Sequence, residues 1–314
     1  MLTVLGGVAA ALAVVGICLH FIAFTTLPWM ALAAGSGYIL LAAPTSGLLF
    51  GLARQWIGAI VALALTLTGV VLVGPRFVSS APPARASAST LVAMTANLRL
   101  GNASPAAVVD YVRTRHVQVL MLEELTPDAR SRLAAAGLDQ LLPHSVVDAR
   151  REASGTGLWS SIPLTDEVKH TSFVMALVTA RLVLDPNQPA SGPLLVAAHM
   201  AGPLPGVKLW GQDMTRMSAL LTSLAQQSSR VIVGGDFNST LDNAQFRRLL
   251  TGGYHDAVEQ AGAGVTATYP ADSVVPPLID IDHVLLRGAG ASDARALHLP
   301  GSDHRALVVR LTIG

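Results

Sequence analysis

The stretch that decides the fold is Val231-Ile232-Val233-Gly234-Gly235-Asp236-Phe237-Asn238-Ser239. Three β-branched apolar residues predict a buried strand, and we expect the two glycines to end it. Because a glycine-rich backbone bends tightly, Asp236 and Asn238 can project into a cleft while Phe237 turns inward and anchors the turn. An ordinary strand followed by an Asx-type turn explains these residues equally well, so the rest of the chain must separate a turn from a site.

The charged residues divide the chain of 314 residues into two parts. Residues 1–90 contain no Asp or Glu, and their only Lys or Arg residues are Arg54, Arg76 and Arg85. All 20 acidic residues and the remaining basic residues lie after residue 90, so the second part is nearly neutral. A nearly neutral surface disfavours tight nonspecific binding to duplex nucleic acid.

Three long apolar runs fill the first part, at residues 2–24, 28–50 and 56–73. Each is close to the ~20 residues that a helix needs to cross the hydrocarbon core of a bilayer. A cleaved signal peptide is the alternative for the first run, but this run lacks a basic start and two similar runs follow it. The sequence therefore predicts an integral, multi-pass plasma membrane protein with three transmembrane helices in residues 1–74, the second interrupted at Pro44. A transporter or channel is disfavoured because the runs contain no charged side chain.

The orientation in the membrane depends on three arginines. Arg54 lies between the second and third runs, and the positive-inside rule places that loop in the cytoplasm. The N-terminus would then be inside and the second part outside. Arg76 and Arg85 follow the third run and favour the opposite orientation. We expect an extracytoplasmic second part.

A Pro/Ser/Ala-rich segment at residues 75–90 predicts a linker that holds residues 91–314 close to the bilayer. The single cysteine, Cys18, lies in the first apolar run. A second part without cysteine fits an oxidising exterior without disulfides, and it does not exclude the cytoplasm.

Most polar candidates in residues 91–314 stand at or just beyond the end of an apolar strand. Two acids, Glu123 and Glu124, follow the apolar run 117–122, and His199 follows the run 194–198. Asp282 lies inside a predicted strand at 279–286. The full set of candidate residues is Asn97, Glu124, His199, Asp236, Asn238, Asp282, Asp303 and His304.

The chemistry of this set favours a hard divalent metal. Carboxylate and amide oxygens suit Mg²⁺, with Mn²⁺ as the alternative, whereas zinc is disfavoured because Cys ligands and a His-x-x-x-His pair are lacking. A histidine beside carboxylates can transfer protons or stabilise charge near neutral pH.

The order of these motifs resembles the endonuclease/exonuclease/phosphatase superfamily over residues 91–314. The matching motifs are Asn97, Leu122-Glu123-Glu124, His199, Gly235-Asp236-Phe237-Asn238, Ile281-Asp282-His283 and Ser302-Asp303-His304. The resemblance implies an α+β fold, a four-layer α/β/β/α sandwich of two mainly antiparallel sheets, preceded here by an all-α transmembrane region. It also implies a site at one end of the sandwich.

The resemblance further implies a metal site in which Glu124 binds the ion, with Asn97 and Asp303 contributing directly or through water. The family usually has Gln before this Glu, and here Glu123 takes that place, so either acid could be the ligand. An Arg commonly stands where this chain has Asp280.

The catalytic roles follow from the same resemblance. Asp236 would orient or deprotonate the attacking water, and Asn238 would contact the phosphoryl oxygens. Asp282 would hold His304 against the phosphate, and His199 would be a further phosphate contact. These groups would neutralise the anionic ester while water displaces the leaving group.

The predicted function is a membrane-anchored, Mg²⁺-dependent phosphoesterase that hydrolyses a phosphodiester or phosphomonoester. An extracellular nuclease on DNA or RNA and a phospholipid headgroup phosphodiesterase are the alternatives, so nucleic acid remains an alternative partner beside the bilayer. A non-catalytic binding module is disfavoured because each motif position keeps its catalytic residue type.

Overall fold

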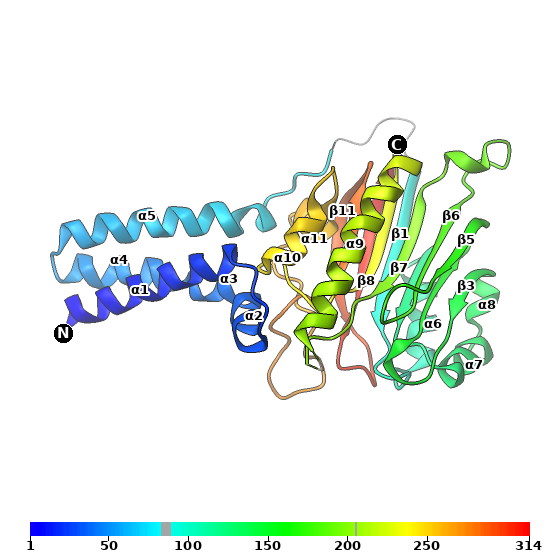
Figure 1. Cartoon of the computed structure of the whole chain (residues 1–314), viewed down its shortest axis with the longest axis horizontal. Helices are drawn as coiled ribbons and strands as arrows, with labels where there is room; N and C mark the ends of the chain where they lie inside the picture. The colour runs from blue at the N-terminus through cyan, green and yellow to red at the C-terminus, as the bar shows by residue number, and fades with distance from the viewer. Residues whose placement is uncertain (83–88, 205) are drawn as a thin grey trace.

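The computed structural model describes residues 1–82, 89–204 and 206–314. Residues 83–88 of the predicted linker, including Arg85, lie outside the described residues, as does Pro205. In the described part, a bundle of helices is followed by two six-stranded sheets that carry helices on their outer faces (Figure 1).

The two sheets have closely related arrangements, β11-β12-β1-β2-β4-β3 and β5-β6-β7-β8-β10-β9. The first sheet contains β1 (Ser89–Asn97), β2 (Val119–Glu123), β3 (His144–Asp148), β4 (Thr156–Ser160), β11 (Ala289–His298) and β12 (Arg305–Ile313). The second contains β5 (Leu164–His170), β6 (Leu177–Leu182), β7 (Leu194–His199), β8 (Val231–Asp236), β9 (His255–Asp256) and β10 (Asp282–Arg287). Only β1–β2 and β7–β8 pair in parallel among these described strands. The predicted sandwich of mainly antiparallel sheets is confirmed.

Helices cover both outer faces of the sandwich. One face is covered by α6 (Pro105–Thr114), α7 (Pro127–Ala135) and α8 (Leu138–Leu141). The other is covered by α9 (Val207–Gln227), α10 (Ala244–Arg247) and η4 (Arg248–Leu250), while α11 (Ala257–Ala261) follows β9. Short turns of 3-10 helix also occur at η2 (Glu152–Ser154) and η3 (Pro189–Ser191).

The strands show the alternation that a sheet between two apolar layers requires. In β1, Leu91 and Ala93 belong to the core between the sheets, whereas Val92 and Met94 pack under the outer helices. Successive side chains of a strand point to opposite faces, so both faces of β1 are apolar. β1 is therefore packed between the opposite sheet and the outer helices along its length, up to the strand end where Asn97 lies.

The glycines of β8 lie within the strand, so the prediction that they end it was wrong. β8 continues through Gly234 and Gly235 to Asp236. A Cβ at Gly235 would lie 1.7 Å from the carbonyl oxygen of Ala198, and one at Gly234 would lie 2.2 Å from Met121 Sδ. Because glycine has no Cβ, Ala198 and Met121 can approach the backbone of β8 this closely. Asp236 is the last residue of the strand.

The N-terminal region consists of α1 (Leu2–Phe21), α2 (Leu27–Ala34), α3 (Ser36–Ile39), α4 (Ala42–Leu52), α5 (Trp56–Val73) and η1 (Gly74–Phe77). Two helices are long and apolar enough to cross a membrane, or three if the bent pair Leu27–Ala34 and Ser36–Leu52 counts as one span. That pair bends by 62°. Pro44 lies in the first turn of α4, and the helix continues past it, so the prediction of a break at Pro44 was wrong. The main break lies at Gly35, directly after α2.

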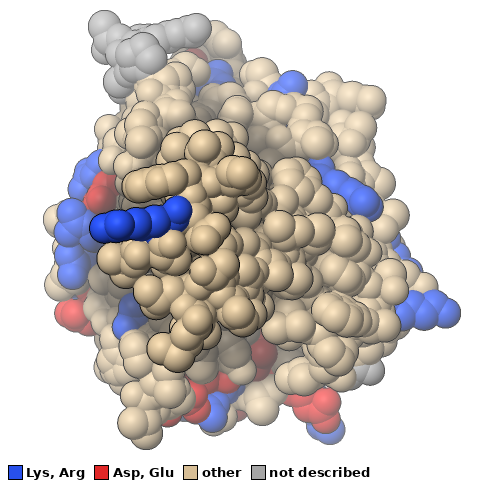
Figure 2. Space-filling model, turned by 90° about the vertical axis from the view of Figure 1, so that its left-hand side faces the viewer, with Lys and Arg blue, Asp and Glu red and all other residues tan. Residues whose placement is uncertain are grey.

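The bundle carries its apolar side chains on the outside. α1, α4 and α5 run side by side away from the sandwich (Figure 1). Viewed from the bundle's end, the front is dominated by uncharged residues, and Lys, Arg, Asp and Glu gather mainly around the edge (Figure 2). Exposed apolar helices of this length are typical of membrane spans.

The sequence after α5 contacts the sandwich directly. The backbone N–H of Gly264 donates to the carbonyl oxygen of Arg76 at 2.8 Å, and that of Ser80 donates to the carbonyl oxygen of Gln260 at 2.9 Å. The described part of the segment predicted as a linker is thus held against the end of α11 and the turn that follows it. The division of the chain at residues 74 and 90 stays a prediction.

Candidate active site

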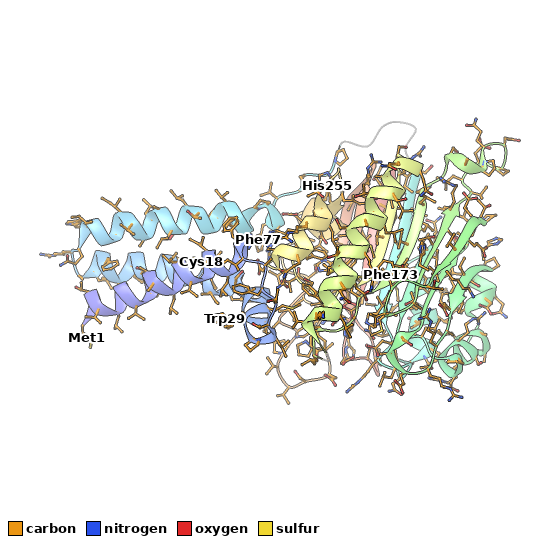
Figure 3. The ribbon with its side chains drawn as sticks, in the orientation of Figure 1. Met1, Cys18, Trp29, Phe77, Phe173 and His255 are labelled. Carbon is orange, nitrogen blue, oxygen red and sulfur yellow. The ribbon has the colours of Figure 1, made fainter. Side chains whose placement is uncertain are left out.

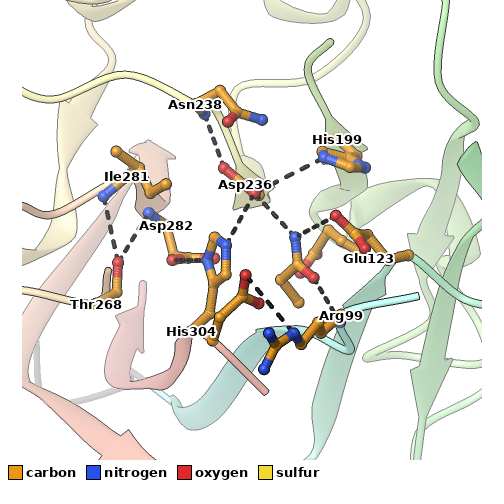
Figure 4. A network of polar contacts seen from close by, with 12 residues as sticks. Arg99, Glu123, His199, Asp236, Asn238, Thr268, Ile281, Asp282 and His304 are labelled. Carbon is orange, nitrogen blue, oxygen red and sulfur yellow. Dashed lines mark hydrogen bonds and ion pairs between the residues drawn. The ribbon is translucent and has the colours of Figure 1, made fainter. Parts of the chain in front are cut away.

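Strand register brings the predicted site residues to one end of the sandwich. Asp236 at the end of β8 is level with His199 of β7 on one side and with Asp282 of β10 on the other. In the other sheet, Asn97 at the end of β1 is level with Glu123 of β2. Because the sheets face each other, these strand ends form the floor of a single site (Figure 4).

His304 is held by a carboxylate on each side. Its Nδ1 lies 2.8 Å from Asp282 Oδ2, and its Nε2 lies 3.8 Å from Asp236 Oδ2. Burial opposes the charged imidazolium, but Asp282 and Asp236 outweigh it and raise the pKa of His304 to about 10. The imidazolium is therefore the stable form at neutral pH and can neutralise an anion.

Asp236 is the centre of the polar network. Its Oδ2 accepts a hydrogen bond from Asn97 Nδ2 at 3.0 Å and lies 3.7 Å from His199 Nε2. The backbone N–H of Asn238 donates to its Oδ1 at 2.8 Å. Burial raises the pKa of Asp236, and the charge of His304 opposes that rise. Asp236 is thus a buried carboxylate that faces two histidines, and the positive charge of His304 favours its ionised form, which can accept a proton.

The turn after Asp236 is anchored as expected. Asn238 has a left-handed backbone, φ 50°, and its Nδ2 donates to the carbonyl oxygen of Met200 at 3.0 Å. Phe237 is fully buried, and its ring meets Phe246 edge-on at 5.3 Å. The prediction that Phe237 lies beneath the site is confirmed.

The two adjacent acids have different environments. Glu124 lines the pocket, and its Oε2 accepts a hydrogen bond from the backbone N–H of Leu100 at 2.6 Å. Glu123 is fully buried, and its Oε1 accepts a hydrogen bond from Thr95 Oγ1 at 2.9 Å. Burial and the neighbouring Asp282 raise the pKa of Glu123 well above its ordinary value. A protonated Glu123 has nearly the shape of the glutamine that is usual at this position.

Asp303 is less enclosed than the other candidates. It lines the pocket and lies 4.0 Å from Arg99 Nε. Arg99 also pairs with Asp272 at 2.8 Å. Sequence reasoning missed Arg99, because a lone arginine after a strand has no distinguishing spacing.

A second buried ion pair supports the floor from below. His283 Nδ1 lies 2.8 Å from Asp256 Oδ2, and its Nε2 lies 2.8 Å from the carbonyl oxygen of Ser239. Burial opposes the charged ring, yet the contact with Asp256 raises the pKa of His283 to about 9. This pair fixes the loop that follows Asn238.

The site is a pocket of about 370 Å³ with two chemically different walls. The polar wall, as we name it, comprises Glu124, His199, Asp236, Asn238, Asp303 and His304. The apolar wall comprises Leu27, Met30, Ala31 and Ala34, all from α2. Asn97 and Asp282 support the polar wall through their hydrogen bonds to Asp236 and His304. The apolar wall was not predicted, since nothing in a hydrophobic run indicates that it borders a site.

The donor set fits a divalent cation. Asp236, Asp282 and His304 each offer a ligand atom within 4.8 Å of the others and could hold a metal ion. Among the described residues, the buried Asp282 Oδ1 has no hydrogen-bond partner. Glu124 and Asp303 add carboxylates at the pocket surface. Carboxylate oxygens are the ligands that Mg²⁺ and Mn²⁺ prefer, and Mg²⁺ needs only one or two of them beside water and substrate oxygens.

Comparison with known proteins agrees with this geometry. The chain belongs to the Endonuclease/Exonuclease/phosphatase family, whose profile matches residues 94–304. It thus has the phosphoesterase fold of that family, with a buried Asp/His cluster that could bind a metal. No curated protein sequence matches the chain.

Three solved structures illustrate the likeness in fold. An endonuclease/exonuclease/phosphatase from Bacteroides vulgatus is 16% identical with a TM-score of 0.58, covering 72% of this chain and 100% of that one. A humanised TDP2 from D. rerio is 16% identical with a TM-score of 0.56, covering 71% and 98%. The 3'-5' exonuclease NExo from Neisseria meningitidis is also 16% identical with a TM-score of 0.56, covering 70% and 98%.

Proposed function

We propose that this protein is a membrane-anchored, divalent-metal-dependent phosphoesterase that hydrolyses a phosphate ester by attack of water. The observation that carries the proposal is the meeting of Glu124, Asp236 and His304 at one pocket, although they come from three distant parts of the chain. Structural ion pairs rarely gather so many titratable groups at the open end of a sandwich, whereas catalytic sites require it.

The metal would be held by Glu124, with Asn97 and Asp303 directly or through water. This assignment is preferred to one centred on Asp236, Asp282 and His304, because a charged His304 imidazolium has no lone pair to give a metal ion. When bound, Mg²⁺ or Mn²⁺ neutralises phosphoryl charge and orients the ester for in-line displacement. Glu123 would serve as a neutral support beneath Glu124.

The side chains of the polar wall divide the remaining work. Asp236 would accept a proton from the attacking water, whose oxygen forms the new bond to phosphorus. His304, oriented by Asp282, would neutralise the phosphate and donate a proton to the oxygen of the breaking P–O bond. Asn238 and His199 would contact the phosphoryl oxygens; His199 Nδ1 lies 3.2 Å from the carbonyl oxygen of Ala153, which leaves Nε2 facing the site.

The test is phosphate-ester hydrolysis by the full chain in detergent with Mg²⁺, using bis(p-nitrophenyl) phosphate and p-nitrophenyl phosphate. We expect Asp236→Ala and His304→Ala each to lower kcat/KM by ~10²–10⁴-fold. Asp128→Ala, on the exposed surface of α7, is the matched control. Metal-dependent activity that is absent, or that survives both substitutions, would falsify the proposal.

For the membrane region we propose three spans, with the N-terminus inside and the catalytic part outside. In the sequence, Arg76 counts as a positive charge favouring the opposite orientation. In the structure Arg76 is buried and its Nη2 contacts Asp242 Oδ1 at 2.5 Å, so its charge is neutralised and no longer counts as a free charge beside the membrane. Arg54, in the turn between α4 and α5, remains as the cytoplasmic charge.

Cysteine labelling of intact cells tests the orientation in a Cys18→Ala background. A membrane-impermeant maleimide should label Asp128→Cys in whole cells, since the Asp128 side chain is exposed on α7 of the catalytic part. It should label Arg54→Cys only after the membrane is opened. The reverse pattern would place the catalytic part in the cytoplasm.

A nuclease is the second candidate. Structures in the comparison include a D. rerio TDP2 complexed with a single-stranded DNA product, 15% identical with a TM-score of 0.54. Single-stranded DNA therefore belongs in the substrate panel. The nearly neutral second part supplies little of the positive charge that binding to a nucleic acid backbone requires.

A further inference from the structure

The apolar wall is an unusual partner for phosphate chemistry. It comes from α2, in the helical region, whereas the polar wall comes from the sandwich. A phosphate ester with a small polar alcohol gains nothing from Leu27, Met30 and Ala31. An apolar surface that faces catalytic residues indicates a substrate with an apolar portion of its own.

Hydrogen bonds hold the apolar wall in place. Asn243 Nδ2 donates to the carbonyl oxygen of Met30 at 3.2 Å, and Thr240 Oγ1 donates to that of Ala34 at 3.0 Å. Both donors belong to the loop that begins at Asp236 and Asn238. The same loop therefore positions the catalytic carboxylate and α2, so the two walls are parts of one built site.

The position of α2 brings this site to the membrane boundary. α2 bends by 62° from the following helix and lies at the end of the bundle beside the sandwich (Figure 1). Trp29 projects from it there with 52% of its surface exposed (Figure 3). Tryptophan is enriched where a membrane meets water, so Trp29 fits a position at the membrane boundary.

Apolar side chains are also exposed on the catalytic part, one of them at the pocket. Leu204, which lines the pocket, is 80% exposed, and Val274, Val275 and Leu278 are exposed as well. The hydroxyl of Tyr38, in α3, donates a hydrogen bond to the carbonyl oxygen of Leu278 at 2.6 Å, so the loop that contains Val274, Val275 and Leu278 is bonded to the helical region. Exposed apolar side chains at the pocket and in a loop bonded to the helices fit contact with lipid rather than water.

We propose that the substrate is a phosphate ester of a bilayer lipid, with its phosphate at the polar wall and its hydrocarbon chain along α2. This inference rests on the proposed phosphoesterase function. The reaction adds one water across a P–O bond: the water oxygen bonds to phosphorus, one water proton passes to Asp236, and the leaving oxygen takes a proton from His304.

The test compares methyl, octyl and dodecyl p-nitrophenyl phosphate with the full chain in detergent and Mg²⁺, each ester below the concentration at which it aggregates. We expect kcat/KM to rise ~fourfold for each methylene that the apolar wall buries, so the octyl ester should exceed the methyl ester by at least ~100-fold. Equal values for the three esters would overturn the lipid inference and leave the phosphoesterase proposal standing.

Three variants of α2 sharpen the test. Ala31→Gln places a polar group in the apolar wall and should lower the octyl-to-methyl ratio at least ~tenfold. Ala31→Leu has a similar size and should keep the ratio high, which separates polarity from bulk. Leu32→Gln is the matched control, since Leu32 lies on α2 outside the pocket lining. An unchanged ratio in Ala31→Gln overturns the inference.

Two further outcomes are decisive. Cleavage of single-stranded DNA in preference to every alkyl ester overturns the lipid inference in favour of a nuclease. Hydrolysis of none of these substrates overturns the phosphoesterase function itself, and the lipid inference with it.

Discussion

The two walls of the pocket are built in different ways. The polar wall collects residues from distant strands, and each is fixed by hydrogen bonds or ion pairs, as His304 is by Asp282. The apolar wall is a single short helix, and the loop after Asn238 holds it by backbone carbonyls. Catalytic side chains must be oriented by directional hydrogen bonds, and each therefore has several partners. Burial of an apolar group is not directional, so an apolar wall needs only to have the right shape and place. The difference suggests that the sandwich supplies the reaction and the membrane region supplies part of the substrate preference.

After Asp236 and His304, the largest effect should come from the metal side of the polar wall. Glu124→Gln removes a pocket carboxylate, and we expect activity at limiting Mg²⁺ to fall by ~10²–10³-fold, with a higher Mg²⁺ concentration for half-maximal rate. Glu123→Gln should change activity by less than ~threefold, because the pKa of Glu123 is raised and the neutral carboxyl resembles an amide. Magnesium titrations of both variants measure this difference. A large loss in Glu123→Gln instead would make Glu123 an ionised ligand.

The contact between the two regions should have the next largest effect. Asp242 is buried between His20 and Arg76, and burial opposes its charge while those partners lower its pKa. Asp242→Ala leaves Arg76 buried without its partner, at a cost of ~3 kcal/mol. The thermal midpoint in detergent should fall by roughly 6–12 °C.

The matched control for Asp242 is Asp128→Ala. Asp128 also pairs with an arginine, but at an exposed helix position, so the midpoint should not change measurably. Equal midpoints for the two variants would mean that the buried pair contributes nothing to the contact between the helices and the sandwich.

The smallest effect concerns the support beneath the polar wall. The pKa of His283 is raised to about 9 in the fold, from about 6.5 in the unfolded chain. The stabilisation is therefore fully present below pH 6.5, and it declines as the pH rises towards 9. Unfolding by urea across this range should show falling stability. Asp256→Asn removes the partner that raises the pKa, so its profile should be flatter; an identical slope would contradict this account.

Much of the catalytic part was predictable from local pattern. Buried strands such as β7 and β8 are continuous apolar runs, and the capped helix α6 begins at Ser104-Pro105 as its sequence indicates. β11 was missed because its residues 289–298 mix glycine, charged residues and alanine without a clear alternation. That strand is formed by its pairing with β12, which no local pattern encodes.

The candidate site divides along the same line. Asp236, His304 and Glu124 were identified because each stands in a motif beside a strand. The order of the motifs resembles that of the family, and this resemblance predicted that the three residues share one site. Alternation in the predicted strand at 279–286 places the side chains of Asp280 and Asp282 on one face. In the structure they have different partners: Asp282 bonds to His304, and Asp280 lies near His283 and Arg76. Asp280 precedes β10 rather than lying within it, so strand alternation does not apply to it.

The sequence by itself determined the layered sandwich, the apolar helices and the residue types of the polar wall, because periodicity and motifs are properties of neighbouring residues. Only the tertiary structure decided that Glu124 faces the pocket while Glu123 is buried, that Arg76 is neutralised by Asp242, and that α2 closes the site. Each of these depends on two segments far apart in the chain coming into contact. Burial and charge pairing at such contacts are set by the folded geometry, and a single strand or helix does not contain them.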